Sequence, residues 1–190
     1  RTYESSTPEP SLAESHELDE SQKVHTFKIK EGEKFSSGNE LTSKDVKFSV
    51  MRTKNLKSNT APHTENVESI ETPDDYTVKF TLKEPDAAFL VKLANNSFAI
   101  LDSEVVKEHG GTDAEDASSK DTAEKWLNSN SAGSGAYVLD KWKQNEELSL
   151  VKNDDYWGEV KNDKVICKEI PDVNTQIQML KQGDIDIASG

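Results

Sequence analysis

The protein has 190 residues, of which 33% are hydrophobic and 31% are charged, and its formal net charge is −13. This length allows one large domain or two small ones, and so acidic a surface repels phosphate, which excludes nucleic acid and anionic membrane headgroups as partners. The single cysteine, Cys167, leaves no intrachain disulfide.

The first predicted strand follows a polar N-terminal stretch. Residues 1–21 are rich in polar residues and contain two prolines, so we expect turn and loop there. In residues 24–30, His25, Phe27 and Ile29 fall on one face and polar residues on the other. This alternation predicts a half-buried strand.

A helix is predicted to begin at Thr42. An acid, Asp45, follows three residues later, which is a variant of the capping box, and an acid in the first turn suits the helix dipole. Four apolar residues then give the helix an apolar side: Val46, Phe48, Val50 and Met51.

A hairpin and two short elements are expected next. Residues 67–71 and 76–82 read as its strands, joined by the turn sequence TPDD at 72–75. Residues 87–94 predict a short buried helix, and residues 98–101 predict a short apolar strand.

The middle of the chain is predicted to be mostly helix and loop. Either Asp102 or Ser103 is suited to cap a short helix that runs toward His109. Residues 110–121 read as a polar loop, and residues 122–127 as another short helix.

The C-terminal part is predicted to contain a second hairpin, at residues 138–143 and 147–152, and then a strand at 165–170. A helix over 171–183, ending at a glycine, and a short strand at 184–188 complete the pattern. The order strand, helix, strand suggests a parallel crossover unit.

No metal site is indicated by the four histidines, His16, His25, His63 and His109. They show no close spacing such as H-x-x-x-H, and one cysteine cannot build a thiolate site. His25 lies in a strand pattern and reads as a packing or surface residue. We therefore expect no metal and no cofactor.

Catalytic patterns are also missing. Asp184 and Asp186 have strand spacing, but they read as solvent-facing acids rather than an acid/base pair. Gly133, Ser134 and Gly135 are too closely spaced for a nucleophile elbow and lack the lysine of a phosphate loop. We expect these glycines to supply unusual backbone torsions where the chain changes direction, and we expect that the protein is not an enzyme.

Several segments, in order, resemble one protein family. The runs are PSLAESH (10–16), TFKIKEGEKF (26–35), GNELTSKDVKFS (38–49), YTVKFTLKEP (76–85), GSGAYVL (133–139), Trp142 with NDDYWG (153–158), and IPD (170–172) with GDID (183–186). They are similar to the motifs of the extracytoplasmic solute-binding proteins of the oligopeptide/dipeptide/nickel ABC-transporter family, family 5. The chain departs from the family pattern at His16, where tryptophan is usual, and at Glu40, where proline is common.

The resemblance implies an α/β fold of the periplasmic-binding-protein type II class, in which an α+β small domain is followed by the start of a mixed α/β lobe. Residues 1–137 would form most of the small second domain, and residues 138–190 would begin the return into the first ligand-binding lobe. Family members are much longer, and both ends of this sequence look cut. We therefore expect an internal segment of a longer protein.

The function implied by the resemblance is the capture of peptides for an ABC importer, by closure of two lobes around the ligand. The implied partners are a peptide or other small solute and the permease subunits, and the implied setting is the periplasm or, as a lipoprotein, the cell surface. A monomer is expected. Nickel or metal-chelate, haem or sugar capture on the same fold, and a peptide-signal receptor or adhesin, stay open as alternatives.

The resemblance also points to site residues. Peptide binders of the family place a tyrosine in the loop after the T-A-E-D-V helix, and His63 occupies the matching loop, so it is the candidate ligand contact. Gly133, Ser134, Gly135 and Tyr137 are expected near the hinge, with a role that is structural first.

Overall fold

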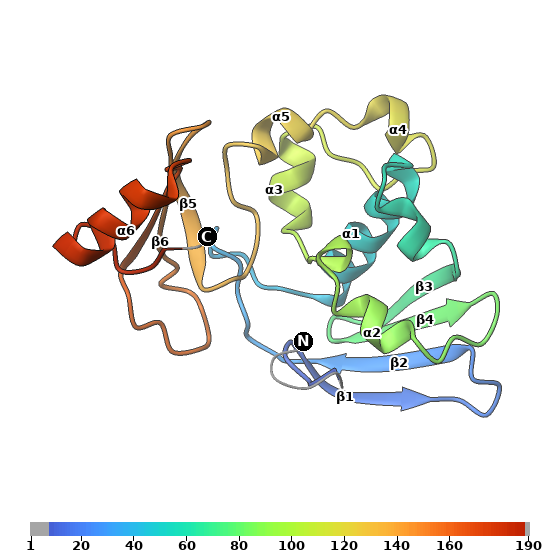
Figure 1. Ribbon diagram of the computed structural model, residues 1–190. Helices are drawn as coiled ribbons and strands as arrows, with labels where there is room; N and C mark the ends of the chain where they lie inside the picture. The colour runs from blue at the N-terminus through green and yellow to red at the C-terminus, as the bar shows by residue number, and fades with distance from the viewer. Residues whose placement is uncertain (1–7, 189–190) are drawn as a thin grey trace.

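The computed structural model describes residues 8–188, so residues 1–7 of the predicted N-terminal loop lie outside the described part of the chain. It contains two antiparallel sheets (Figure 1). The first has the order β1-β2-β4-β3. Its strands are β1 (Ala13–Leu18), β2 (Val24–Ile29), β3 (Val67–Asp74) and β4 (Thr77–Leu82).

The strand β1 corrects the prediction of a loop over residues 1–21. Its sequence, AESHEL, has only a weak alternation of apolar and polar residues. The strand forms because it pairs with β2, where His16 lies opposite Phe27 and Leu18 opposite His25. The stabilising contacts are therefore those of the partner strand, which a local pattern does not reveal.

The predicted strands β2 and β4 are confirmed. The side chains of His25, Phe27 and Ile29 are buried on one face, as are Val78 and Phe80 of β4. The strand β3 runs further than predicted, through the expected turn residues to Asp74, whose carboxylate accepts a hydrogen bond from the backbone N–H of Tyr76 at 2.9 Å.

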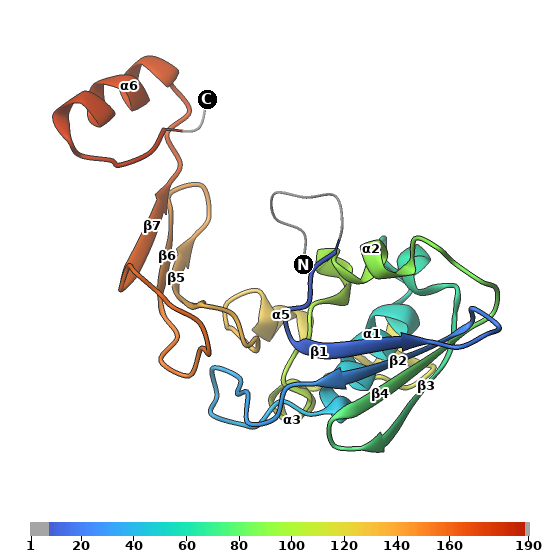
Figure 2. The same cartoon turned by 90° about the horizontal axis from the view of Figure 1, so that it is seen from below.

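Helices lie over one face of the first sheet, some of them on the strands and others on a neighbouring helix, as Figures 1 and 2 show. They are α1 (Ser43–Leu56), η1 (Ala61–Thr64), α2 (Phe89–Leu93), η2 (Asn96–Phe98), α3 (Ser103–Glu108), α4 (Ala117–Lys120) and α5 (Glu124–Leu127). Among residues 8–188, none of the helices is both long and apolar enough to cross a membrane.

Two predictions in this helical layer are wrong. The expected strand at 98–101 is absent: Phe98 ends the 3-10 turn η2, which the Asn95 side chain starts by accepting a hydrogen bond from the N–H of Ser97, and residues 99–101 form no regular element. The polar loop at 110–121 contains the helix α4, which buries Ala117.

The helix α1 lies between two apolar clusters. Its Val46 and Val50 join the main core on the sheet, which also contains Phe27, Phe80 and Phe89. On another side of the helix, Phe48 packs in a second cluster of buried side chains that comprises Phe48, Val106, Ala123 and Ala132. The predicted capping box is confirmed, since the Thr42 N–H donates to the Asp45 carboxylate at 2.9 Å.

A buried ion pair attaches α1 to the polar loop. Arg52 donates to both carboxylate oxygens of Asp121, at 2.7 and 2.8 Å, and the Asp121 side chain is only 1% exposed. Burial raises the pKa of Asp121, but the hydrogen bonds from Arg52 and from the N–H of Thr112 outweigh it and hold that pKa below its ordinary value.

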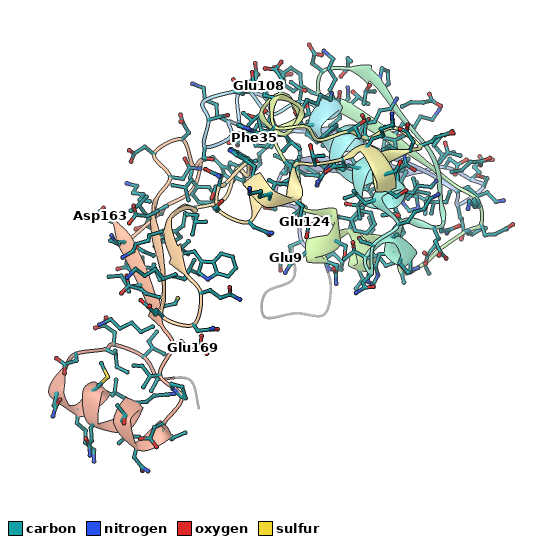
Figure 3. The ribbon with its side chains drawn as sticks, turned by 90° about the horizontal axis from the view of Figure 1, so that it is seen from above. Glu9, Phe35, Glu108, Glu124, Asp163 and Glu169 are labelled. Carbon is teal, nitrogen blue, oxygen red and sulfur yellow. The ribbon has the colours of Figure 1, made fainter. Side chains whose placement is uncertain are left out.

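The second sheet has the order β5-β6-β7, and the helix α6 follows it. Its elements are β5 (Tyr137–Lys143), β6 (Glu147–Lys152), β7 (Lys164–Lys168) and α6 (Val173–Gln182). In Figure 3, Asp163 and Glu169 flank β7, and α6 lies beyond Glu169, away from the first sheet.

The predicted helix ends are confirmed here, but the parallel crossover is not. Asp172 caps α6 by accepting from the N–H of Thr175, and Gly183 ends it with a φ of +79°. However, β7 is antiparallel to β6, and residues 184–188 form no strand, with Ile187 83% exposed. Asp184 and Asp186 are exposed, as predicted.

The carboxylate of Asp102 connects two segments, the start of α3 and the turn at residues 37–39. Its Oδ1 accepts from the backbone N–H groups of Glu104 and Val105 at 3.1 Å and so caps α3, as predicted. Its Oδ2 accepts from the Ser37 hydroxyl at 2.5 Å and from the Asn39 side-chain amide at 3.0 Å. Asp102 is 1% exposed, so these four bonds replace its hydration.

We expect Asp102→Ala to lower the free energy of unfolding by about 3 kcal/mol, because it removes a helix cap and leaves buried donors without an acceptor. Asp102→Asn keeps one acceptor oxygen, which can still cap the helix, but it has no second acceptor oxygen for Ser37 and Asn39. Its free energy of unfolding should therefore fall by about half as much. Urea unfolding of the three proteins measures both values. Equal stability of wild type and Asp102→Ala would contradict the assignment.

Candidate functional site

The chain passes from the first sheet to the second through residues 131–139, here called the connecting segment. On one side it is bound to the first sheet's layer. The carbonyl of Gly133 accepts from the N–H of Ser36 at 3.0 Å, and the carbonyl of Ala132 accepts from the N–H of Asp102 at 2.8 Å.

On the other side the connecting segment is bound by Asn153. The Asn153 backbone N–H donates to the carbonyl of Ala136 at 3.0 Å, and its side-chain amide donates to the carbonyl of Gly135 at 2.8 Å. Asn153 is only 4% exposed. In the sequence, Asn153 was only the first residue of the NDDYWG motif. Its role could not be predicted there, because it binds Gly135, which lies 18 residues earlier in the chain.

The expectation for the two glycines of this segment is wrong. Positive φ angles occur at other glycines, but not at Gly133 or Gly135. A Cβ atom at Gly135 would meet no atom within 4 Å, and one at Gly133 would come no closer than 4.0 Å to another residue. The turn here is held by hydrogen bonds rather than by a conformation that only glycine adopts. Tyr137 begins β5 and pairs with Lys152.

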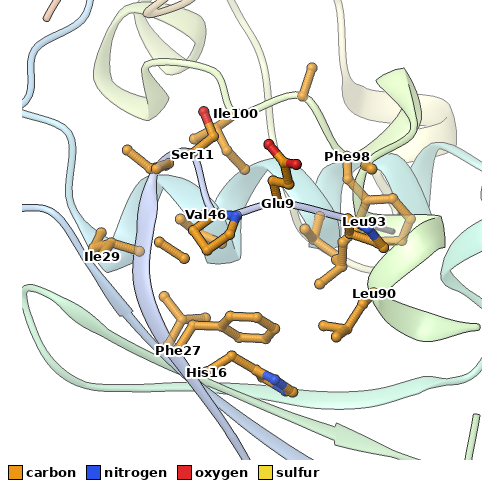
Figure 4. Close-up of a pocket in the computed structure, with 18 of the residues that line it drawn as sticks. Glu9, Ser11, His16, Phe27, Ile29, Val46, Leu90, Leu93, Phe98 and Ile100 are labelled. Atoms are coloured by element: carbon orange, nitrogen blue, oxygen red, sulfur yellow. The ribbon is translucent and has the colours of Figure 1, made fainter. Parts of the chain in front are cut away.

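A cavity of about 530 Å³ lies between the first sheet and the helices that cover it (Figure 4). Its lining includes Phe27 and Phe80 from the sheet, Leu90 from α2, and the residues before β1. Ser134 of the connecting segment also lines it, and so does Trp157.

Two histidines meet at this cavity although they are nine residues apart. The Nε2 atom of His16 lies 2.9 Å from Nδ1 of His25, and the rings are stacked with centroids 5.1 Å apart. His16 lines the cavity and also stacks on Phe27 at 4.6 Å. Sequence reasoning missed this pair because the residues before β2 were expected to form a loop; the register of a β1–β2 hairpin would have revealed it.

His25 is a packing residue, one of the two roles expected for it, but it is an unusual one. It is 3% exposed, and its Nε2 atom has no hydrogen-bond partner among the described residues. Burial lowers the pKa of His25, the charge of a protonated His16 lowers it further, and Asp19 and Asp86 raise it only in part. Burial also lowers the pKa of His16. Both rings are therefore neutral at pH 7.

The residues predicted as site residues do not converge. His63 lies exposed on η1, and it does not line the cavity that Ser134 lines. Within residues 8–188, no three histidine, cysteine or acidic side chains are grouped to hold a metal ion. The described side chains that line the cavity can make apolar contacts and hydrogen bonds with a ligand.

The sequence of residues 7–190 matches the family model "Bacterial extracellular solute-binding proteins, family 5 Middle". The chain belongs to this family. The resemblance seen in its ordered motifs is thereby confirmed.

Two relatives of the chain are named as peptide-binding proteins. The chain is 37% identical over 181 residues to the probable D,D-dipeptide-binding periplasmic protein DdpA of Escherichia coli K12, covering 95% of this chain and 33% of that protein. It is 35% identical to the oligopeptide-binding protein AppA of Bacillus subtilis, covering 93% and 32%. The chain therefore spans about a third of the length of these relatives.

Solved structures confirm the fold class. The periplasmic binding protein DppA from Helicobacter pylori, in complex with the peptide STSA, superposes with a TM-score of 0.78 at 28% identity, over 97% of this chain and 38% of that one. NikZ from Campylobacter jejuni, in complex with Ni(L-His), has a TM-score of 0.78 at 27% identity, over 93% and 34%. The fold is that of part of a type II periplasmic binding protein.

The His25 pair predicts a pH dependence. Because the pKa of His25 is lowered in the folded state, the unfolded state binds more protons below about pH 6.5, and the free energy of unfolding should fall as the pH decreases from there to the folded-state pKa. Each unit of separation corresponds to about 1.4 kcal/mol.

Urea unfolding between pH 7.5 and pH 5 measures this loss. His25→Phe keeps an aromatic ring against Phe27 and Phe89 but removes the titratable imidazole, so its profile should be flatter than that of wild type in this window. Identical slopes for wild type and His25→Phe would show that another group is responsible.

Proposed function

We propose that the protein is the extracytoplasmic substrate-binding component of an ABC importer and that it captures peptides by closure of two lobes. The family match over residues 7–190 carries this proposal. It is supported by relatives named for dipeptide and oligopeptide binding at 35–37% identity. Binding of this kind requires a complementary shape and hydrogen bonds rather than a nucleophile. The proposed function is therefore binding without catalysis.

The proposal divides the chain into a small domain, residues 1–137, and the start of the first ligand-binding lobe, residues 138–190. Its support is that the first sheet lies within the first range and that the second sheet, apart from Tyr137 at the start of β5, lies within the second. We assign a structural role to Gly133, Ser134, Gly135 and Tyr137. The connecting segment is bonded on both sides, so the two sheets move as one body while the hinge of closure lies elsewhere.

The partners that follow from this function are a peptide and the permease subunits of the importer. We propose that the protein is a monomer outside the cytoplasm. It would be either free in the periplasm or held at the cell surface by a lipid anchor. The protein's net charge of −13 opposes binding to nucleic acid.

Native mass spectrometry of the gently purified complete protein tests this function. We expect a series of bound masses that fragment as peptides, because a tolerant peptide cleft retains cellular peptides through purification. A bound metal chelate or haem would replace peptide capture by another solute on the same fold, and turnover of added peptide would show an enzyme.

His63 is proposed as a ligand contact on the small domain, since it is exposed on the loop after α1. With a peptide identified in this way, His63→Ala should weaken binding about two- to tenfold in calorimetry, the effect of one hydrogen bond. His109→Ala is the matched control, since His109 packs on Trp126 at a ring distance of 4.1 Å. An unchanged affinity in His63→Ala would remove the assignment.

A further inference from the structure

The cavity above the first sheet has the size and the walls of a small-molecule site. Its volume of about 530 Å³ lies within the range of roughly 300–1,000 Å³ that such sites occupy. Figure 4 shows Phe27 and His16 on one side of the opening and Leu90, Leu93 and Phe98 on the other. The walls are mostly aliphatic and aromatic, which favours a flat apolar ligand.

His16 is the polar side chain that stacks on the aromatic wall, against Phe27. The lining also contains serines and asparagines, namely Ser11, Ser15, Asn95, Asn96 and Ser134. The Nε2 atom of His16 is hydrogen-bonded to His25. The other nitrogen of this half-buried ring, Nδ1, has no hydrogen bond among the described residues. If His25 donates, then Nδ1 of His16 carries a hydrogen and is a donor; if His16 donates, Nδ1 is an acceptor. A hydroxyl group satisfies either tautomer, because it both donates and accepts.

The charges at the cavity favour an uncharged ligand over an anion. Neither lysine nor arginine is among the lining residues, so an anion would lose its hydration without gaining a partner. The charged residue of the lining is Glu9, and its carboxylate adds to the cost of placing an anion there.

We propose that this cavity is a binding site for a small uncharged aromatic molecule with a hydroxyl group, of the size of a simple phenol. Its ring lies against Phe27 and Leu90, and its hydroxyl bonds to the imidazole of His16. The site is separate from the proposed capture of peptides, and the proposal does not depend on that function.

Three probes of nearly equal shape test the site in the complete protein: p-cresol, toluene and 4-methylbenzoate. By titration calorimetry and ligand-observed NMR, p-cresol should bind saturably and about five- to tenfold more tightly than toluene, the effect of one hydrogen bond. The anionic 4-methylbenzoate should bind more weakly than toluene.

Variants at residue 16 separate the hydrogen bond from the space. His16→Phe keeps an aromatic wall without the nitrogen, so p-cresol and toluene should bind within twofold of each other. His16→Trp fills the cavity and should weaken both by more than tenfold, whereas His109→Trp, at the exposed end of α3 and outside the lining, should change neither.

The proposal is overturned if p-cresol does not bind saturably, for instance because another part of the complete protein fills the cavity. It is also overturned if wild type does not prefer p-cresol over toluene, or if His16→Trp binds both like wild type. Urea unfolding confirms that each variant is folded before its binding is compared. A peptide-free protein that still binds p-cresol would support this site while removing the proposed function.

Discussion

The carboxylate of Asp102 is the contact on which the arrangement of the first sheet's layer and the connecting segment depends. It caps α3, holds the turn at Ser37 and Asn39, and lies in the residue whose backbone N–H binds the carbonyl of Ala132. One residue earlier in that turn, Ser36 binds Gly133. The same buried group thus organises both the start of a helix and the exit of the chain toward the second sheet.

Asn153 completes this arrangement from the other sheet, since it binds the carbonyls of Gly135 and Ala136. With bonds on both sides, we propose that the connecting segment is a spacer rather than a hinge. Under the proposed function such stiffness would favour binding, because binding energy would be spent on closing one lobe against another and not on ordering the parts within a lobe.

Local sequence patterns predicted the elements whose burial is periodic. The alternation of Val78, Phe80 and Leu82 and the capping residues Thr42, Asp102 and Asp172 are local signals, and the structure confirms them. The strand β1 was missed because it depends on pairing with β2, and with it the contact between His16 and His25. The cavity could not be predicted either, since its volume results from the packing of segments that lie far apart in the sequence, from residue 8 to Trp157. The ordered motifs identified the family. The roles of His63 and of residues 133–137 could not be predicted in the same way, because they depend on contacts with residues far away in the sequence.

The central claim, that the two sheets form one rigid body, is tested by a spin-label distance across the connecting segment. Cys167 is exposed on β7, and Glu71→Cys places a second label on β3 of the first sheet. Double electron–electron resonance on the complete protein, with and without saturating peptide, should give the same distance distribution. A distribution that shifts when peptide binds would place the hinge within residues 131–139 and contradict this account.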